Sequence, residues 1–333
     1  MRRVAKRNPA LRTFQKLRRL MRRVFIETPL LNLARLLIPA FPRRVILTIA
    51  TGIGHLGYML AAKTRRVALA NMDIAYGKSI SMQEKKAVVL ASFISACRLI
   101  LDLLWFSRRT KKRLAKWTWY DDSLKQSFSE GAQLFVSAHF GNWEMLGLML
   151  PYNGNYGTSI AKRIRNPAVD KFLNKIRTTT GQQIVYKQGG IRPVIAQIKN
   201  GGCVCLVVDQ DTRPEDGGVF VDFFGLPAPI SGAAAGLSIK MGLKVYPLFC
   251  VLERDGRYRA YTRECLVPQP DEDQSQLTRR IATALQSEIK SAPGNWLWMY
   301  KRWKRRIPGK KSAQYPFYAL EELVSDDVNM PSD

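Results

Sequence analysis

The sequence predicts an α/β fold with a largely parallel central sheet flanked by helices, preceded by an α-helical, membrane-associated N-terminal region. Three observations lead to this prediction. From Gly131 onward, short apolar runs alternate with helical patterns, as in chains that build a parallel sheet from strand–helix units. Residues 82–107 show wide apolar faces at helical spacing. The first 66 residues combine apolar and basic side chains, a pattern typical of membrane surfaces.

We expect three parts along the chain. Residues 1–66 form a basic, amphipathic and apolar membrane-anchoring region, residues 67–320 form the α/β catalytic domain, and residues 321–333 form a loose acidic tail. The 333 residues are enough to bury a large core, and a hydrophobic content of 46% excludes a disordered chain.

Charge is the most pronounced feature of the composition. The formal net charge is +27, and residues 1–66 hold 16 Lys or Arg against the single acid Glu27, which is a net +15. Such an excess requires an anionic partner, which could be nucleic acid, a membrane surface, or an acidic protein or substrate. The basic residues flank apolar segments rather than aromatic platforms for bases, so we expect an anionic membrane and no nucleic acid.

Two N-terminal segments suit such a membrane contact. Residues 10–26 place apolar side chains at helical spacing with arginines on the other faces, although an ordinary solvated helix has the same pattern. Val45 to Ala62 is a run of 18 residues without a formal charge, close to the length needed to cross a bilayer. Basic residues lie on both sides of this run, so whether it spans the membrane or lies in it stays open. A soluble core helix is the alternative.

The elements of the α/β part follow from turn signals and apolar periodicity. Expected strands are Thr158–Lys162, Gln183–Tyr186, Cys203–Val208, and a hairpin of Val245–Leu252 with Tyr258–Cys265. Expected helices are Pro167–Thr180, Ile191–Asn200, a short one capped by Ser231 that runs to Met241, and Leu277–Lys290.

One stretch, Leu134–Leu148, has the strand, turn and helix pattern expected of a catalytic site. An apolar strand leads into a tight turn at Gly141 and Asn142, and a helix follows. His139 lies at the strand exit and Glu144 in the first turn of the helix. On one continuous helix these two side chains would point roughly 140° apart. Across a strand-to-helix turn they converge, so we expect Glu144 to hold one ring nitrogen of His139 and orient it as a general base.

A single histidine at a strand end is commonly only a satisfied polar residue. Two histidines occur in this chain, His55 and His139, and of the two only His139 lies in a turn suited to a site. The five cysteines form no zinc or disulfide pattern; Cys203 and Cys205 alternate within an apolar strand and are expected to be buried. We therefore expect a reducing compartment, no metal site and no cofactor.

Further polar residues follow predicted strands and could share one edge of the sheet with His139. Lys162, Arg163 and Arg165 place three cations ahead of a helix start, which suits phosphate, although a solvated basic loop has the same pattern. Asp209 and Asp211 could orient a cation, the base region or sugar hydroxyls, or only cap a turn. With Asn142, we take Lys162, Arg165, Asp209 and Asp211 as the candidate substrate-binding residues.

The motif around His139 resembles a known family. His-x4-Glu after an apolar strand, filled by Phe140-Gly141-Asn142-Trp143, is similar to the signature of glycerolipid-type acyltransferases, and most of all to the late acyltransferases of bacterial lipid A biosynthesis. Further blocks follow in the order of that family: Lys162 where arginine is commoner, Asp209-Gln210-Asp211, Pro247, and Ser291–Trp298 with Gly294 where Glu is common.

This resemblance implies acyl transfer from an acyl carrier protein thioester to a hydroxyl of a lipid A precursor, a phosphorylated glycolipid, at the cytoplasmic face of the inner membrane. It implies direct transfer through a ternary complex, with His139 as base, Glu144 as its orienter and no serine or cysteine nucleophile. Two alternatives stay open. The chain could acylate a lysophospholipid or another membrane lipid, or it could be a non-enzymatic membrane or nucleic-acid binding protein.

Overall fold

The structure is a computed structural model that describes residues 27–128, 131–155, 157–161, 163–164, 166–186, 190–307, 314–319 and 321–322. The expected helix at residues 10–26, the side chains of Lys162 and Arg165, and most of the acidic tail lie outside the described residues.

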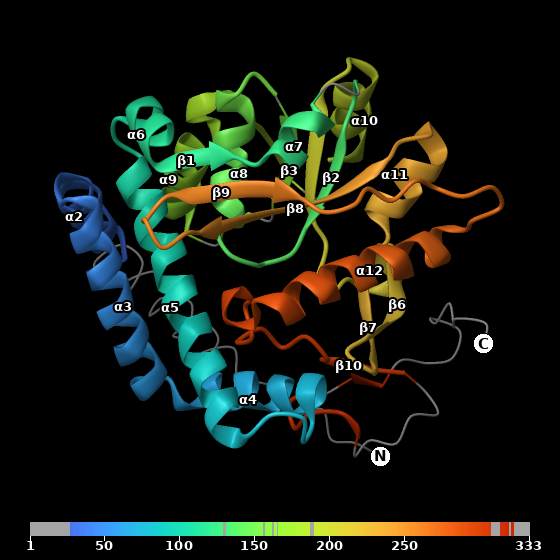
Figure 1. Ribbon diagram of the computed structural model, residues 1–333, viewed down its shortest axis with the longest axis horizontal. Helices are drawn as coiled ribbons and strands as arrows, with labels where there is room; N and C mark the ends of the chain where they lie inside the picture. The colour runs from blue at the N-terminus through green and yellow to red at the C-terminus, as the bar shows by residue number, and fades with distance from the viewer. Residues whose placement is uncertain are drawn as a thin grey trace, which may run out of the picture.

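The centre of the fold is a seven-stranded sheet with the order β1-β9-β8-β2-β5-β3-β4 (Figure 1). All its neighbouring strands run parallel except the β8–β9 hairpin, so the expected α/β fold is confirmed. The strands are β1 (Thr118–Tyr120), β2 (Leu134–Ser137), β3 (Gly157–Ala161), β4 (Gln183–Tyr186), β5 (Cys203–Val207), β8 (Val245–Leu252) and β9 (Tyr258–Thr262).

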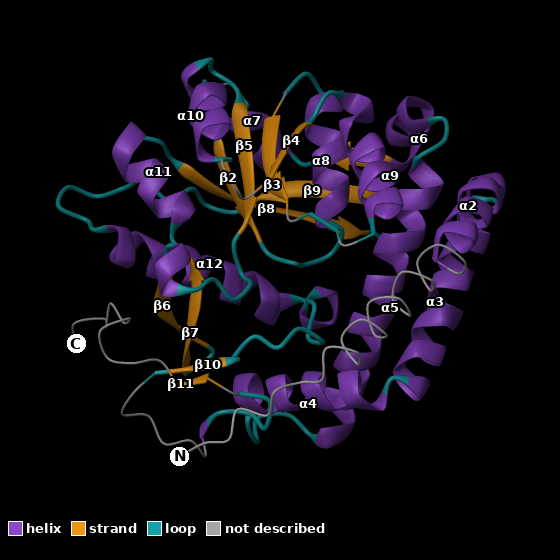
Figure 2. Cartoon of the chain, turned by 180° about the vertical axis from the view of Figure 1, so that it is seen from behind, coloured by secondary structure: helices purple, strands orange, loops and turns teal. Residues whose placement is uncertain are grey.

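Helices cover both faces of this sheet (Figure 2). The described α-helices, which include those that lie outside the sheet against α5, are α2 (Thr28–Leu37), α3 (Arg43–Leu60), α4 (Ala62–Tyr76), α5 (Met82–Phe106), α6 (Thr110–Trp117), α7 (Asp122–Ser127), α8 (Trp143–Tyr152), α9 (Pro167–Arg177), α10 (Ile191–Lys199), α11 (Ala233–Met241) and α12 (Gln274–Ser291). Two small sheets complete the described fold: the hairpin of β6 (Gly218–Phe223) with β7 (Leu226–Ser231), and the pair of β10 (Arg305–Arg306) with β11 (Glu321–Glu322).

Strand β2 shows why this sheet needs helices on both faces. Leu134 and Val136 point into a core shared with α10, α11 and α12, whereas Phe135 points into a second core shared with α5, α8 and α9. Successive side chains of a strand alternate between faces, and here both faces are apolar. A continuous apolar run such as Leu134–Val136 is therefore the pattern of a buried parallel strand.

The N-terminal helices lie against the body along α5. Helix α3 packs beside α5, and α4 crosses the lower end of both at 91° to α3 (Figure 1). By length and composition, α5 is the one described helix that could cross a membrane alone. Helices α3 and α4 together would make a second candidate span, broken at the bend between them. The expected domain boundary at residue 66 falls inside α4.

A buried ion pair joins α3 to α5. The guanidinium of Arg43, the first residue of α3, donates from Nη1 and Nη2 to the carboxylate of Asp102, and both side chains are almost wholly buried. The hydroxyl of Tyr258 donates to the same carboxylate at 2.5 Å. Because burial strips water from both charges, each depends on its partner.

Most expected elements agree with the structure, and three details do not. Strand β1 and the β6–β7 hairpin were missed, because β1 is only three residues long and the hairpin sequence is interrupted by prolines. Ser231 is not the cap residue of α11; Gly232 holds that place, and the Ser231 hydroxyl accepts a bond from the backbone N–H of Ala233.

Removing Asp102 tests whether the ion pair holds α3 in place. Asp102→Ala leaves the Arg43 charge buried without its carboxylate, so the free energy of unfolding should fall by about 3–5 kcal/mol. Urea denaturation followed by tryptophan fluorescence measures the loss. Asp122→Asn removes a carboxylate from an exposed pair with Lys125 and should leave the denaturation midpoint unchanged. Equal midpoints for both variants would contradict a role for the buried pair.

Candidate active site

The site forms where two neighbouring strands end. Strands β2 and β5 are parallel, and their register pairs Ser137 with Val207. His139 and Asp209 each lie two residues beyond these partners, at the carboxyl edge of the sheet. Equal spacing from paired positions brings the two side chains together, although 70 residues separate them in sequence.

The imidazole of His139 is paired with the carboxylate of Asp209. Nδ1 lies 2.7 Å from Oδ1 of Asp209, and the indole Nε1 of Trp296 donates to Oδ2 at 2.8 Å. Burial alone would raise the pKa of the Asp209 carboxyl, but the His139 ring and the Trp296 indole hold it below its ordinary value. An ionised Asp209 fixes a proton on Nδ1, so Nε2 is the ring nitrogen that is left to accept one.

The turn that carries His139 is held from two sides. The carbonyl of His139 accepts a bond from the N–H of Leu297 at 3.0 Å, and the N–H of Gly141 donates to Asn295 at 2.9 Å. Gly141 has a φ of 58°, and a Cβ at this position would lie 2.1 Å from the carbonyl oxygen of Cys250. Only glycine therefore fits between the turn and β8.

Glu144 does not orient His139, and that prediction was wrong. Its carboxylate pairs with the guanidinium of Arg177, the last residue of α9, with Nε at 2.8 Å and Nη2 at 2.5 Å. The ring of Trp143 packs against the His139 imidazole instead, with their centroids 4.8 Å apart. Asn142 caps α8, and the ring of Trp143, the first residue of the helix, lies against His139. Glu144, the second residue of the helix, faces α9 instead.

The other candidate residues take different places. Asn142 is buried and its Oδ1 accepts a bond from the N–H of Met145, so it is a helix cap. The carboxylate of Asp211 contacts Nε of Arg305 at 3.0 Å rather than His139. Lys162 and Arg165, which were predicted to bind substrate, lie outside the described residues.

Two partners in the site were missed from the sequence: Trp296 as the donor to Asp209, and Arg177 as the partner of Glu144. Asp209 was predicted to bind substrate, with orientation of the base region as an alternative, and the structure pairs it with His139. One signal was available for Asp209. Both it and His139 follow a predicted strand, but only the strand order shows that these two strands are neighbours.

The arrangement suits proton transfer. No group of three or more His, Cys, Asp or Glu among the described residues is placed to hold a metal ion. Burial raises the pKa of the Cys203 and Cys205 thiols to about 12, so neither is a thiolate near neutral pH. A histidine oriented by a carboxylate can remove a proton from a hydroxyl and later return it.

Known proteins resemble this chain at low identity. A phosphatidylinositol mannoside acyltransferase from Mycolicibacterium smegmatis is 28% identical over 181 residues, which are 53% of this chain but only 58% of that protein, less than two thirds of its length. Lipid A biosynthesis acyltransferase 2 from Shigella flexneri is 23% identical over 80% of this chain and 85% of that protein. The solved 1-acyl-sn-glycerophosphate acyltransferase from Thermotoga maritima aligns over 75% of this chain and 97% of its own at a TM-score of 0.36 and 14% identity, too weak a likeness to carry an argument.

The relation to a family is broader than any of these pairs. The sequence model of the bacterial lipid A biosynthesis acyltransferases matches residues 12–305, which include the whole of the sheet, His139 and Asp209. This chain belongs to the bacterial lipid A biosynthesis acyltransferase family.

Proposed function

We propose that this chain transfers a fatty acyl group from an acyl carrier protein thioester to a hydroxyl of a lipid A precursor at the cytoplasmic face of the inner membrane. The observation that carries the proposal is the His139–Asp209 pair at the carboxyl edge of the sheet. Family membership supports acyl transfer to a lipid, and the donor, the acceptor and the membrane face are parts of the proposal.

His139 is the general base in this proposal. Nε2 takes the proton of the acceptor hydroxyl while the oxygen attacks the thioester carbon, and the Asp209 carboxylate stabilises the imidazolium that forms. The C–S bond breaks, and the imidazolium returns its proton to the leaving thiolate. An unperturbed imidazole titrates near pH ~6.5, so it can accept and return a proton near neutrality.

Glu144 has a structural role in this mechanism. Its pair with Arg177 ties the first turn of α8, next to His139, to the end of α9. Both side chains are mostly buried, and the carboxylate of Glu144 raises the pKa of the Arg177 guanidinium although burial lowers it. We therefore assign Glu144 to holding the His139 turn against α9, and not to proton transfer.

The donor surface in this proposal is α6. No acidic residue lies between Asp102 and Asp121, and five exposed cations lie on α6 and just before it: Arg108, Arg109, Lys111, Lys112 and Lys116. Burial, and then the charges of Arg109, Arg108 and Arg43, lower the pKa of Arg113 to about 10, which shows how crowded these cations are. A cationic surface of this kind suits an acidic carrier protein.

The acceptor is expected to bind at the ends of β3 and β4, beside His139. Arg163 is exposed there, and its guanidinium lies 4.4 Å from the centre of the Tyr186 ring. With Lys162 and Arg165, proposed from sequence, it would offer three cations to a phosphorylated glycolipid. A phosphatidylinositol mannoside is the second candidate acceptor, because the relative with 28% identity is named for it.

A membrane surface lies on α2 and α3. Ten of the 17 exposed large hydrophobic side chains of the described residues fall between Leu30 and Leu60, and Leu60 itself is 73% exposed. Such a concentrated apolar face marks an interaction surface. The opposite side of α3 packs on α5, which in turn packs on α8, so α3 could not cross a bilayer without drawing the polar body into it. We therefore propose that α3 lies in one leaflet.

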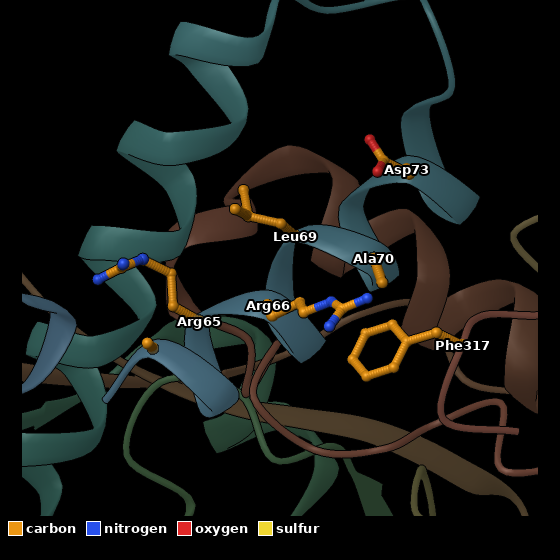
Figure 3. A pocket seen from close by; sticks show the side chains of 7 residues that line it. Arg65, Arg66, Leu69, Ala70, Asp73 and Phe317 are labelled. Atoms are coloured by element: carbon orange, nitrogen blue, oxygen red, sulfur yellow. The ribbon is translucent and has the colours of Figure 1, made fainter. Parts of the chain in front are cut away.

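Two basic pockets flank this apolar face and suit lipid phosphates. One, of about 350 Å³, lies beside the bend between α3 and α4, where Arg66 reaches over Phe317 (Figure 3). Arg65, which also lines this pocket, points away from Phe317 in the same view and donates to the carbonyl of Met59 at 3.1 Å. The other pocket, of about 390 Å³, lies between α2 and α9 and is lined by Arg35 and Lys175 among others.

Substitutions in the pair test the mechanism. His139→Ala should lower kcat at least about a hundredfold, because general-base catalysis is worth about 10² to 10⁴ in rate. Asp209→Asn should lower kcat similarly. Glu144→Gln should lower the melting temperature, and its loss of kcat should be smaller than that of Asp209→Asn. Steady-state assays on folded protein, checked by circular dichroism, give these values. Near-normal activity of His139→Ala would remove it as the base, and an equal kcat loss in Glu144→Gln and Asp209→Asn would return Glu144 to the catalytic pair.

Substrate assays test the donor and the acceptor. Purified protein should acylate a phosphorylated lipid A precursor from acyl carrier protein, with mass spectrometry showing one added acyl chain. Lysophospholipid and phosphatidylinositol mannoside are the comparison acceptors, and acyl-CoA is the comparison donor. A higher kcat/KM for either comparison acceptor would contradict the acceptor proposed here. A higher kcat/KM for acyl-CoA would contradict the proposed donor.

Charged substitutions on α3 test the membrane surface. Leu56→Asp together with Met59→Asp places charges on the face proposed to enter the bilayer and should release most of the protein from washed membranes. Val267→Asp, at a position that is 50% exposed on the body, is the matched control and should sediment as the unaltered protein does. Full sedimentation of the α3 variant would place the membrane contact elsewhere.

A further inference from the structure

The guanidinium of Arg163 rests on an aromatic ring at the carboxyl edge of the sheet, the edge that also carries His139. The register of β3 and β4 pairs Ala161 with Tyr186, the last residue of each strand, and Arg163 follows β3 two residues later. Its guanidinium lies over the Tyr186 ring, 4.4 Å from the ring centre. A cation over an aromatic face requires none of its hydrogen-bond donors, so this contact orients the guanidinium and leaves its donors for an oxyanion.

The ring of Tyr186 is itself held in place. Its hydroxyl donates to Oδ2 of Asp170 at 2.7 Å and accepts a bond from Nδ2 of Asn174 at 2.8 Å. Oδ1 of Asp170 accepts a bond from the N–H of Ile164, the residue after Arg163, at 2.8 Å. One buried carboxylate therefore fixes both the ring under Arg163 and the backbone next to it.

Stabilising α9 does not require this network. Asp170 lies in the first turn of α9, where an exposed acid would already interact favourably with the helix dipole. Here it is buried, and its two oxygens bind the loop after β3 and the last residue of β4. Arg163 itself is exposed, and among the residues that the structure describes no acid lies within ion-pair distance of its guanidinium. Its charge is thus oriented but not neutralised.

The same loop also touches the proposed membrane surface. Asn166 caps α9 through Oδ1, and its Nδ2 donates to Oε2 of Glu27 at 3.1 Å. Glu27 directly precedes α2, whose exposed leucines belong to that surface. Strand β5 alone separates β3 from β2, so the strands that carry Arg163 and His139 lie roughly 10 Å apart. A phosphate at Arg163 and a hydroxyl at His139 therefore fit a single lipid head group.

We propose that Arg163 binds the phosphate of the acceptor head group, and that Tyr186, anchored by Asp170, is its positioning residue. A guanidinium that is oriented before binding loses less conformational freedom when the phosphate arrives, and its planar set of donors matches the phosphate oxygens. Arg163 then selects acceptors that carry a phosphate, while His139 acts on the hydroxyl. This inference rests on the proposed acyl transfer to a phosphorylated glycolipid.

The KM for acceptors with and without the phosphate tests the role of Arg163. In nonionic detergent micelles, which contain no other anionic lipid, Arg163→Ala should raise KM for the phosphorylated acceptor at least about tenfold and change kcat little. Removing the phosphate from the acceptor should raise the KM of the unaltered protein similarly and leave that of the variant unchanged. Lys199→Ala is the control: it removes an exposed cation at the end of α10, before the amino end of β5, and should keep the original KM.

Variants of Tyr186 separate positioning from direct binding. Tyr186→Leu removes the ring and should raise KM for the phosphorylated acceptor alone, by roughly twofold to fivefold. Tyr186→Phe keeps the ring and should retain most of the affinity. In the Arg163→Ala background Tyr186→Leu should add nothing, because the ring acts through the guanidinium. An equal rise in KM for both acceptors, or a further rise in the double variant, would overturn the positioning role.

Binding of a soluble probe gives a reading that needs no turnover. In saturation-transfer nuclear magnetic resonance, glucose 1-phosphate should bind more weakly to Arg163→Ala than to the unaltered protein, whereas glucose should show no difference. Weaker probe binding in a protein without acyltransferase activity would keep the phosphate site and reject the proposed function. Unchanged probe binding and an unchanged KM in Arg163→Ala would overturn the inference and leave the role of His139 as it stands.

Discussion

The hydrogen bond between Nδ1 of His139 and the Asp209 carboxylate is the interaction on which the candidate active site depends. It exists because β2 and β5 are parallel neighbours in a register that places both residues two positions past a paired position. A one-residue slip between these strands would turn one of the side chains to the other face of the sheet. Leu134 and Val136 pack into one core and Phe135 into the other, so the same packing that buries β2 also positions the residues that follow it.

The segment around Trp296 closes this geometry from the other side. Its backbone binds the His139 turn at Leu297 and Asn295, and its indole binds the carboxylate of Asp209. Residues that follow β2 and β5 and residues from the C-terminal part of the chain therefore meet at one site, and the family match includes all of them.

The sequence was enough to predict the fold class and the sheet strands other than β1, and to single out His139 as a candidate site residue, because apolar periodicity and turn residues are local signals. It was not enough to identify the partner of His139. Glu144 was expected from its spacing in one motif, whereas Asp209 reaches the histidine through a strand order that no local pattern records. Arg177 is likewise a partner through tertiary packing, and it sits where sequence alone shows only a basic residue.

A double-mutant cycle on kcat tests the central claim most directly. If His139 and Asp209 act as one unit, the variant with both His139→Ala and Asp209→Asn should be scarcely slower than either single variant. The parallel cycle of His139→Ala with Glu144→Gln should instead show losses that multiply, because Glu144 acts on the fold through Arg177. Multiplying losses in the first cycle, or a single shared loss in the second, would contradict the assignment of Asp209 as the partner of the catalytic histidine.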